Sequence, residues 1–201
     1  MAACLGAAND GYYLTRDPFG EAGDFVTAPE ISGLFGEMCG LYLAHMFEIA
    51  GKPSGAAVAE LGPGRGTLMR DMRHAWAGLM PELAGAPVHL LETSPLLRAA
   101  QKEVIGSDAA LAWHDKVTGL TAAVAGPVFG IANEFFDALP AAQYIWRDGS
   151  WHHRLVGLRD DRFGFITGGQ VPDDPAFPEA PRDGMVAELC PQADDVMASL
   201  A

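Results

Sequence analysis

The spacing of apolar residues changes along the chain, and each change predicts a boundary between elements. Residues 1–33 are rich in Gly, Pro, Asp and Thr, which predicts a segment made mainly of loops. From Pro29, where a helix can open, apolar residues recur at helical spacing up to Gly51. This pattern predicts an amphipathic helix stopped by Gly51 and Pro53, and thus an N-terminal loop and helix segment over residues 1–54.

Short apolar runs then alternate with helical stripes. The runs predict four strands, the first of them buried, and the stripes predict the helices between the first three. Strands that alternate with helices imply right-handed crossovers and a parallel sheet, so residues 55–140 are predicted to form a doubly wound α/β core. The predicted strands are 56–61, 88–91, 111–113 and 128–132, and the helices are 67–79 and 95–104.

A third pattern follows the fourth strand. Three short strand-like pieces, 143–146, 151–157 and 162–166, are joined by Asp-Gly and Asp-Asp turns and predict an antiparallel β-meander. Residues 168–184, rich in Pro, Asp and Gly, predict a mobile loop that completes an insertion over 141–190. Residues 191–201 predict the start of the next core helix. A doubly wound sheet usually continues with a further strand, so the sheet is expected to be incomplete.

Composition and charge narrow the function classes. The chain has 201 residues, of which 49% are hydrophobic, enough for one sizeable core. Its net charge of -13 disfavours nucleic-acid binding and suits a basic protein partner or a cationic side chain, although the acidity could also serve only solubility. No apolar stretch predicts membrane insertion, and the three cysteines have no spacing for a metal or redox site, so a soluble intracellular protein is expected.

The strongest chemical signal is the glycine-rich turn E-L-G-P-G-R-G at 60–66, between the first strand and the next helix. Gly62, Gly64 and Gly66 let a ligand approach the backbone, and the helix start offers free N–H groups. A dinucleotide fingerprint would need glycine at Thr67. The acid two residues before the first glycine, Glu60, would instead compensate the α-ammonium of a methionine moiety. The turn therefore favours S-adenosylmethionine over NAD, with a ligand-free tight turn as the alternative.

Acids also follow the next two strands. Glu92 is predicted to bind the ribose hydroxyls of a nucleotide on the glycine turn, the alternative being a solvated acid at a strand end. Asp115 is predicted to accept a hydrogen bond from an adenine amino group, although Asp also favours any loop start.

The segment N-E-F-F-D-A-L-P at 133–140 follows the fourth strand, where doubly wound folds place the ligand crevice. Asn133 is predicted to lie against the cofactor, and Glu134, with Asp137 as second choice, to hold a cationic nitrogen by charge-assisted hydrogen bonds. The alternative is that both phenylalanines belong to the core and the acids cap the next turn.

Four segments resemble the MidA-type family of S-adenosylmethionine-dependent methyltransferases, which includes the mitochondrial complex I assembly arginine methyltransferase. They are G-D-F-V-T-A-P-E-I-S-G-L-F-G-E (23–37), E-L-G-P-G-R-G-T-L (60–68), L-L-E-T-S-P-L-L-R (90–98) and A-N-E-F-F-D-A-L-P (132–140). The resemblance implies a Rossmann-like class I methyltransferase fold, S-adenosylmethionine as cofactor, and methylation of an arginine in a complex I subunit. It assigns Glu60 and the three glycines to the cofactor-binding loop, and it makes Glu92 the acid that binds the ribose.

Family members are longer at both ends, so the resemblance implies a fragment or a truncated product whose exposed sheet edge could pair with another chain as a homo-oligomer. It implies a cytoplasmic location in a bacterium and the mitochondrial matrix in a eukaryote. A non-catalytic assembly or binding factor is the main alternative. A nicotinamide dehydrogenase is disfavoured by Thr67 and by the lack of an evident acid–base pair for hydride transfer.

Overall fold

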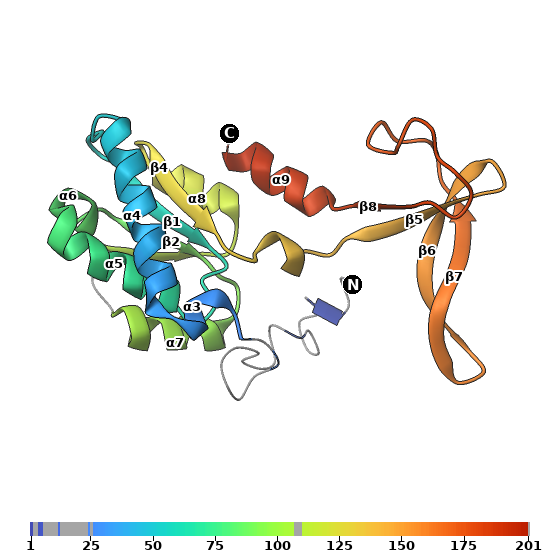
Figure 1. Ribbon diagram of the computed structural model, residues 1–201, viewed down its shortest axis with the longest axis horizontal. Helices are drawn as coiled ribbons and strands as arrows, with labels where there is room; N and C mark the ends of the chain where they lie inside the picture. The colour runs from blue at the N-terminus through green and yellow to red at the C-terminus, as the bar shows by residue number, and fades with distance from the viewer. Residues whose placement is uncertain (2–3, 6–11, 13–23, 25, 107–109, 201) are drawn as a thin grey trace. The chain divides into compact units, whose positions relative to one another are not determined.

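In the computed structural model, four parallel strands form a sheet in the order β3-β2-β1-β4 (Figure 1). The model describes residues 1, 4–5, 12, 24, 26–106 and 110–200. The strands are β1 (Ala57–Leu61), β2 (Val88–Leu91), β3 (Leu111–His114) and β4 (Val128–Ala132). The connections carry α5 (Thr67–Leu79), α6 (Pro81–Ala84), α7 (Pro95–Ile105) and α8 (Val117–Ala123). This arrangement confirms the predicted Rossmann-like α/β fold.

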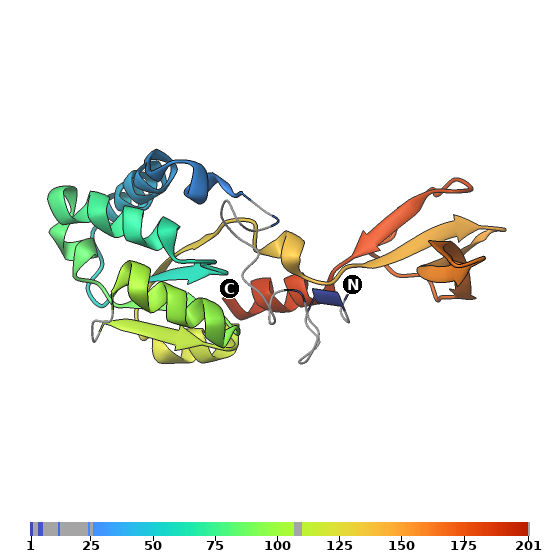
Figure 2. The same cartoon turned by 90° about the horizontal axis from the view of Figure 1, so that it is seen from below.

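Strand β1 lies at the centre of the core because both of its faces are covered (Figure 2). Val58 faces a cluster with Phe47 of α4 (Gly33–Ile49) and Trp76 of α5, whereas Ala59 and Leu61 face a second cluster with α8. Such two-sided burial explains why the strand reads as a continuous apolar run rather than an alternating one. The only charged residue in it, Glu60, is therefore placed in the interior.

The helix predicted from Pro29 onward is interrupted at Ser32. The structure has a short α3 (Ala28–Ile31) and a long α4 (Gly33–Ile49), and Ser32 between them is extended, with φ -155°. The Ser32 hydroxyl oxygen accepts a hydrogen bond from the N–H of Leu34 at 3.2 Å. Serine favours this N-cap role over a helix interior, so a new helix begins there.

The buried face of α4 also differs from the predicted apolar stripe. Its buried residues include Gly36 and Gly40, and the carbonyl of Gly40 accepts a 2.7 Å hydrogen bond from Trp76 of α5. A Cβ at Gly36 would lie 2.6 Å from the Cβ of Asp71, so small residues here allow close helix packing. Besides the small residues, Leu43 and Phe47 are buried, and several other large apolar side chains of α4 are exposed, namely Leu34, Met38, Leu41, Tyr42, Met46 and Ile49.

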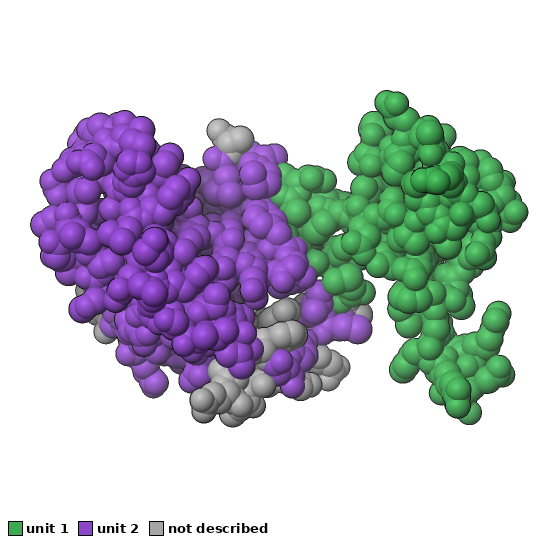
Figure 3. All heavy atoms as spheres, viewed as in Figure 1, with its two compact units in different colours: residues 1–2, 139–195 green, residues 3–138, 196–201 purple. Residues whose placement is uncertain are grey.

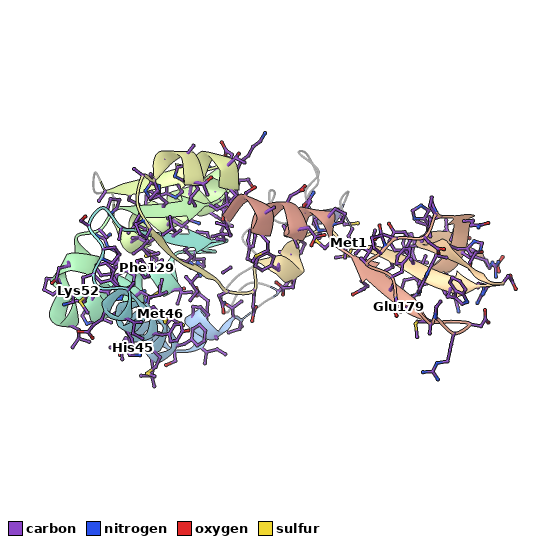
Figure 4. All side chains as sticks on the ribbon, turned by 90° about the horizontal axis from the view of Figure 1, so that it is seen from above. Met1, His45, Met46, Lys52, Phe129 and Glu179 are labelled. Carbon is purple, nitrogen blue, oxygen red and sulfur yellow. The ribbon has the colours of Figure 1, made fainter. Side chains whose placement is uncertain are left out.

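Successive residues of α4 differ in burial, among them His45 and Met46, which are labelled in Figure 4 together with Phe129 of the sheet. His45 and Met46 are exposed, whereas the neighbouring Phe47 packs edge-to-face on Phe129 of β4 with ring centroids 5.3 Å apart. The aromatic pair fixes α4 against the sheet.

Within the described residues, no helix is both long enough and apolar enough to cross a membrane.

Residues 139–195 make up most of a second compact unit, which is described by itself (Figure 3). Its antiparallel sheet has the order β7-β6-β5-β8. The strands are β5 (Ala142–Arg147), β6 (Ser150–Arg159), β7 (Arg162–Gln170) and β8 (Val186–Leu189). The predicted meander corresponds to β5, β6 and β7. The predicted loop over 168–184 is wrong at its start, where β7 continues to Gln170, and β8 was not predicted because four residues carry too little pattern.

An aromatic cluster covers one face of this second sheet. Trp151 is buried and stacks on Phe177 at 4.6 Å between ring centroids, and Trp146 meets Trp151 edge-to-face at 5.4 Å. Phe177 comes from the segment between β7 and β8, so part of the predicted mobile loop is anchored by this contact. Helix α9 (Pro191–Leu200) follows β8, as the sequence predicts.

Candidate cofactor site

Four predicted site residues lie directly after the four parallel strands. Gly62 follows β1, Glu92 follows β2, Asp115 follows β3 and Asn133 follows β4. Because the strands are parallel and in register, their carboxyl ends meet at one edge of the sheet. β2 and β3 follow β1 on one side of the sheet, whereas β4 lies on the other side of β1, so the strand order reverses there. Open α/β sheets bind ligands at such a switch point. The structure therefore gathers these residues at the expected edge.

The turn after β1 needs its glycines. Gly62, Gly64 and Gly66 all have positive φ, at 67°, 53° and 89°. A Cβ on Gly62 would lie 2.9 Å from the ring of Phe135, and one on Gly66 would lie 2.8 Å from Ile105. The N–H of Gly66 donates to the carbonyl of Pro63 at 2.8 Å, which closes the turn just before α5. The result is a bare backbone loop at the N-terminus of a helix, suited to an anionic or polar ligand group.

Glu60 is a buried acid without a hydrogen-bond partner for its Oε2 among the described residues. Only 2% of it is exposed, and burial raises its pKa to about 8. Buried charges are normally paired, so an orphaned carboxyl beside a ligand loop calls for a cationic group. The α-ammonium of a methionine moiety has that chemistry. The buried acid beside the glycine loop therefore fits the predicted cofactor.

Glu92 is held in a defined orientation at the end of β2. Its Oε1 accepts a 2.7 Å hydrogen bond from the N–H of Ser94, and its Oε2 accepts one from Gln101 at 3.4 Å. Burial raises the pKa of Glu92, whereas the backbone N–H groups of Ser94 and Thr93, the Gln101 amide and the Arg98 charge oppose that rise. An acid fixed in this way can accept hydrogen bonds from two ribose hydroxyls.

Asp115 is tied to Glu92 through Arg98. Arg98 Nη2 donates to Asp115 Oδ1 at 2.7 Å, and Arg98 Nε donates to the Glu92 carbonyl at 2.8 Å. The Asp115 side chain is 74% exposed, so its second oxygen is accessible for an adenine amino group. The adenine contact itself stays a prediction. The sequence reasoning missed Arg98 and Gln101, although both lie on the helix that directly follows Glu92 and are three residues apart, on one helix face.

The segment after β4 reaches the glycine loop through Phe135. This ring packs against the second core cluster and lies beside Gly62, which supports a core role for Phe135. Glu134 is exposed and adopts a left-handed φ of 50°, a conformation that is uncommon for non-glycine residues. Asn133 is half-buried, and Asp137 is exposed in the 3-10 turn η1 (Phe136–Ala138). Their predicted roles remain predictions.

Helix α3 contacts the start of α5. Thr67 Oγ1 donates to Glu30 Oε1 at 2.8 Å, so Glu30, from the predicted 23–37 signature, lies beside the end of the glycine loop. Part of that signature falls outside the described residues. Thr67, whose presence argued against a dinucleotide fingerprint, therefore joins α3 to the loop.

The fold and the site together define a nucleotide-cofactor-binding α/β domain with an acid–glycine turn. Residues 38–201 match the model of a family described as "Putative S-adenosyl-L-methionine-dependent methyltransferase". The chain belongs to this methyltransferase family, which confirms the predicted MidA-type resemblance and the predicted cofactor class.

Its relatives point the same way. The chain is 37% identical to the protein arginine methyltransferase NDUFAF7 homolog, mitochondrial, of Drosophila melanogaster, over 74% of this chain and 38% of that protein. It is 31% identical to the human protein arginine methyltransferase NDUFAF7, mitochondrial, over 95% of this chain and 48% of that protein. A solved structure from Burkholderia thailandensis, bound to S-adenosyl-homocysteine, is similar with TM-score 0.71 at 26% identity and covers 99% of this chain and 52% of that one. The chain thus spans about half the length of these proteins.

Proposed function

We propose that this chain builds the cofactor site of an S-adenosylmethionine-dependent methyltransferase that modifies an arginine nitrogen of a protein. The observation that carries the proposal is the buried Glu60 next to the glycine loop, whose Oε2 has no hydrogen-bond partner among the described residues, with Glu92 fixed at the neighbouring strand end. The family match supports the cofactor class, and the names of the relatives support arginine as the acceptor.

Each site residue has a distinct part in this proposal. Glu60 compensates the α-ammonium group, Glu92 accepts hydrogen bonds from the ribose, and Asp115 accepts one from the adenine amino group. Asn133 lies at the adjoining strand end, beside the methionine moiety. When bound, the cofactor supplies a methyl group on a sulfonium centre, which a nucleophilic nitrogen can accept. The chain's own task is mainly to align that nitrogen and to exclude water from it.

Glu134 is our first choice for holding the substrate guanidinium, with Asp137 as the second. Both are exposed, just beyond the carboxyl end of β4, and their carboxylates can form charge-assisted pairs with a guanidinium. The left-handed φ of Glu134 fixes where its side chain leaves the backbone.

Changing Glu134 to Gln is expected to slow methyl transfer to an arginine-containing peptide by about 10- to 100-fold, because the neutral amide loses the charge-assisted pair. Transfer is measured with a radiolabelled methyl donor, and S-adenosyl-homocysteine affinity is measured alongside and should not change. Asp148→Asn is a matched control, since Asp148 is also an exposed acid with a left-handed φ, of 52°, but lies in the β5–β6 turn. Unchanged transfer by the Glu134→Gln variant would contradict the role.

The cofactor proposal has its own test. Calorimetric titration of the chain with S-adenosyl-homocysteine is expected to show micromolar binding, and titration with NADH is expected to show none. The carboxyl of Glu60 can ionise to pair with an ammonium group, whereas it offers no counter-charge to a pyrophosphate. A folded chain that binds neither ligand, or binds NADH, would refute the proposed site.

The finer identity of the substrate is also part of the proposal. We expect the substrate to be a basic protein segment, because the chain has a net charge of -13 and attracts cationic groups. On the MidA-type resemblance we expect that segment to belong to a subunit of respiratory complex I. The two mitochondrial relatives favour the mitochondrial matrix for a eukaryotic source, and the cytoplasm is expected for a bacterial one. Self-association as a homo-oligomer belongs to the same proposal.

A non-catalytic assembly or binding factor is the second candidate function. It is favoured by the exposed apolar residues of α4, since large exposed apolar patches mark interaction surfaces. The double variant Glu60→Ala/Gly64→Val separates the two candidates, because it should lose the cofactor site. If it still supports assembly of the partner complex, docking rather than methyl transfer is the function.

A further inference from the structure

Gln101 on α7 is a polar side chain that the structure buries completely, with 0% exposed. A buried amide is costly unless its donors and acceptor are all paired. Its Nε2 donates to the carbonyl of Gly64 at 2.7 Å and to Glu92 Oε2 at 3.4 Å, and its Oε1 accepts from Trp113 Nε1 at 2.8 Å. One side chain thus joins the loop after β1, the acid after β2 and a residue of β3.

The chemistry of these partners fixes which way the amide points. The indole N–H of Trp113 can only donate, and the Gly64 carbonyl can only accept. A flipped amide would place acceptor against acceptor and donor against donor. Only a group that donates from one end and accepts at the other satisfies all three partners, so neither a carboxylate nor an apolar side chain can replace Gln101.

The stem of Gln101 supports the loop as well. A Cβ on Gly66 would lie 3.3 Å from Gln101 Cγ, so the two residues are in close contact. Gly64 and Gly66 both have positive φ, and because glycine backbone has the widest conformational freedom, contacts with its surroundings are needed to keep such a loop in one conformation. Gln101 therefore contacts this loop at two points, the Gly64 carbonyl and Gly66.

We propose that Gln101 is the positioning residue that sets the glycine loop and the ribose-binding acid Glu92 at a fixed spacing, so that one ligand can bind both. The proposal rests on the proposed cofactor function for its consequence, but the linkage itself is a property of the ligand-free chain. Gln101 does not touch the reacting atoms. It acts through Gly64 and Glu92, and Trp113 orients it.

The linkage is tested first without ligand, by hydrogen exchange of the backbone N–H groups of residues 62 and 64–66. In the Gln101→Met variant we expect exchange about tenfold faster or more in this loop, because the Gly64 carbonyl loses its partner, and unchanged exchange in the second half of α5. Glu103→Gln is the control on the same helix, since Glu103 is exposed. Loop exchange equal to that of the wild type would overturn the proposal, whether or not the chain binds a cofactor.

A milder variant keeps the test valid if Gln101→Met fails to fold. Trp113→Phe leaves Gln101 in place, keeps an aromatic ring at position 113 and removes the donor that orients the Gln101 amide. We expect a smaller rise in loop exchange than in Gln101→Met, confined to the same residues. An effect spread evenly over the whole sheet would indicate general destabilisation and would overturn the positioning role.

The second readout is affinity for S-adenosyl-homocysteine, expressed as the ratio to the wild type at the same pH. Gln101→Met is expected to bind about 10- to 100-fold more weakly at every pH. Gln101→Glu should bind weakly at neutral pH, because its carboxylate faces Glu92, an acid that Arg98 already offsets in the wild type. It should recover at low pH, where a protonated carboxyl can donate again.

The two proposals fail in different ways. A wild type that binds no S-adenosyl-homocysteine, with the exchange result as expected, refutes the proposed function and supports the linkage. A wild type that binds, with Gln101→Met binding equally well, refutes the positioning role and supports the cofactor site. A purely structural residue would not produce the pH-dependent recovery of Gln101→Glu.

Discussion

Replacing Gly66 by alanine should abolish measurable S-adenosyl-homocysteine binding and lower the free energy of unfolding by about 2 kcal/mol. Gly66 has a φ of 89°, which L-residues adopt only at a cost. The added Cβ would also lie 2.8 Å from Ile105 Cδ1 and 2.9 Å from Ile105 Cγ1, so α7 or its side chain must shift. Because Gly66 is the N-cap of α5, any shift moves the helix start that a ligand would contact.

Gly78 offers a matched control within the same helix. An added Cβ there meets nothing within 4 Å, and Gly78 has no positive φ. Gly78→Ala should therefore raise the free energy of unfolding by roughly 0.5 kcal/mol through higher helix propensity and leave binding unchanged. Urea unfolding and calorimetry measure both variants. If Gly66→Ala binds as tightly as Gly78→Ala, the glycine loop is not the ligand loop.

The positions of the parallel strands could be predicted from the sequence because each is a short apolar run bounded by loop residues. β2 and β4 begin and end as predicted, and β1 differs by one residue. β1 and β2 are buried throughout, whereas β4 alternates exposed and half-buried residues. The strand ends then located Glu92 and Asn133, because in a parallel sheet every carboxyl end lies at one edge.

Features that depend on packing between distant segments could not be predicted in this way. The buried face of α4 is set by Gly36 and Gly40 lying against α5, which periodicity of large apolar residues cannot reveal. Gln101 reads as an ordinary polar position on a helix, and its three partners come from segments up to 37 residues away. The strand β8 depends on pairing with β5, 41 or more residues earlier in the chain, as the pair Ile145 and Val186 shows.

Glu60 should make the stability of the chain fall as the pH rises. Its pKa is raised by burial from the ordinary 4.5 to about 8. Below pH 4.5 both folded and unfolded chains keep the proton, so the stability is fully present there. Between pH 4.5 and 8 the unfolded chain ionises while the folded chain stays protonated, and stability is lost, by a few kcal/mol in total. Above pH 8 this loss is complete.

The Glu60→Gln variant should remove this dependence, because an amide does not titrate. Urea unfolding at pH 5, 6.5 and 8 should show wild-type stability falling relative to the variant, whereas Glu103→Gln should follow the wild type, since Glu103 is exposed. Parallel pH curves for Glu60→Gln and the wild type would mean that Glu60 is ionised at neutral pH in the folded chain.

Ligand affinity should show the opposite trend, and that opposition identifies what Glu60 is for. An ammonium group favours the ionised carboxylate, so S-adenosyl-homocysteine should bind more tightly as the pH rises toward 8 and should displace a proton near pH 7. Calorimetry in two buffers of different ionisation enthalpy measures that proton directly. Glu60→Gln should release none and bind about 10- to 100-fold more weakly. If Glu60 served only the fold, the chain would lose stability with rising pH and its ligand affinity would not rise. If Glu60 binds a cation, the ionised carboxylate that destabilises the free chain is stabilised in the complex.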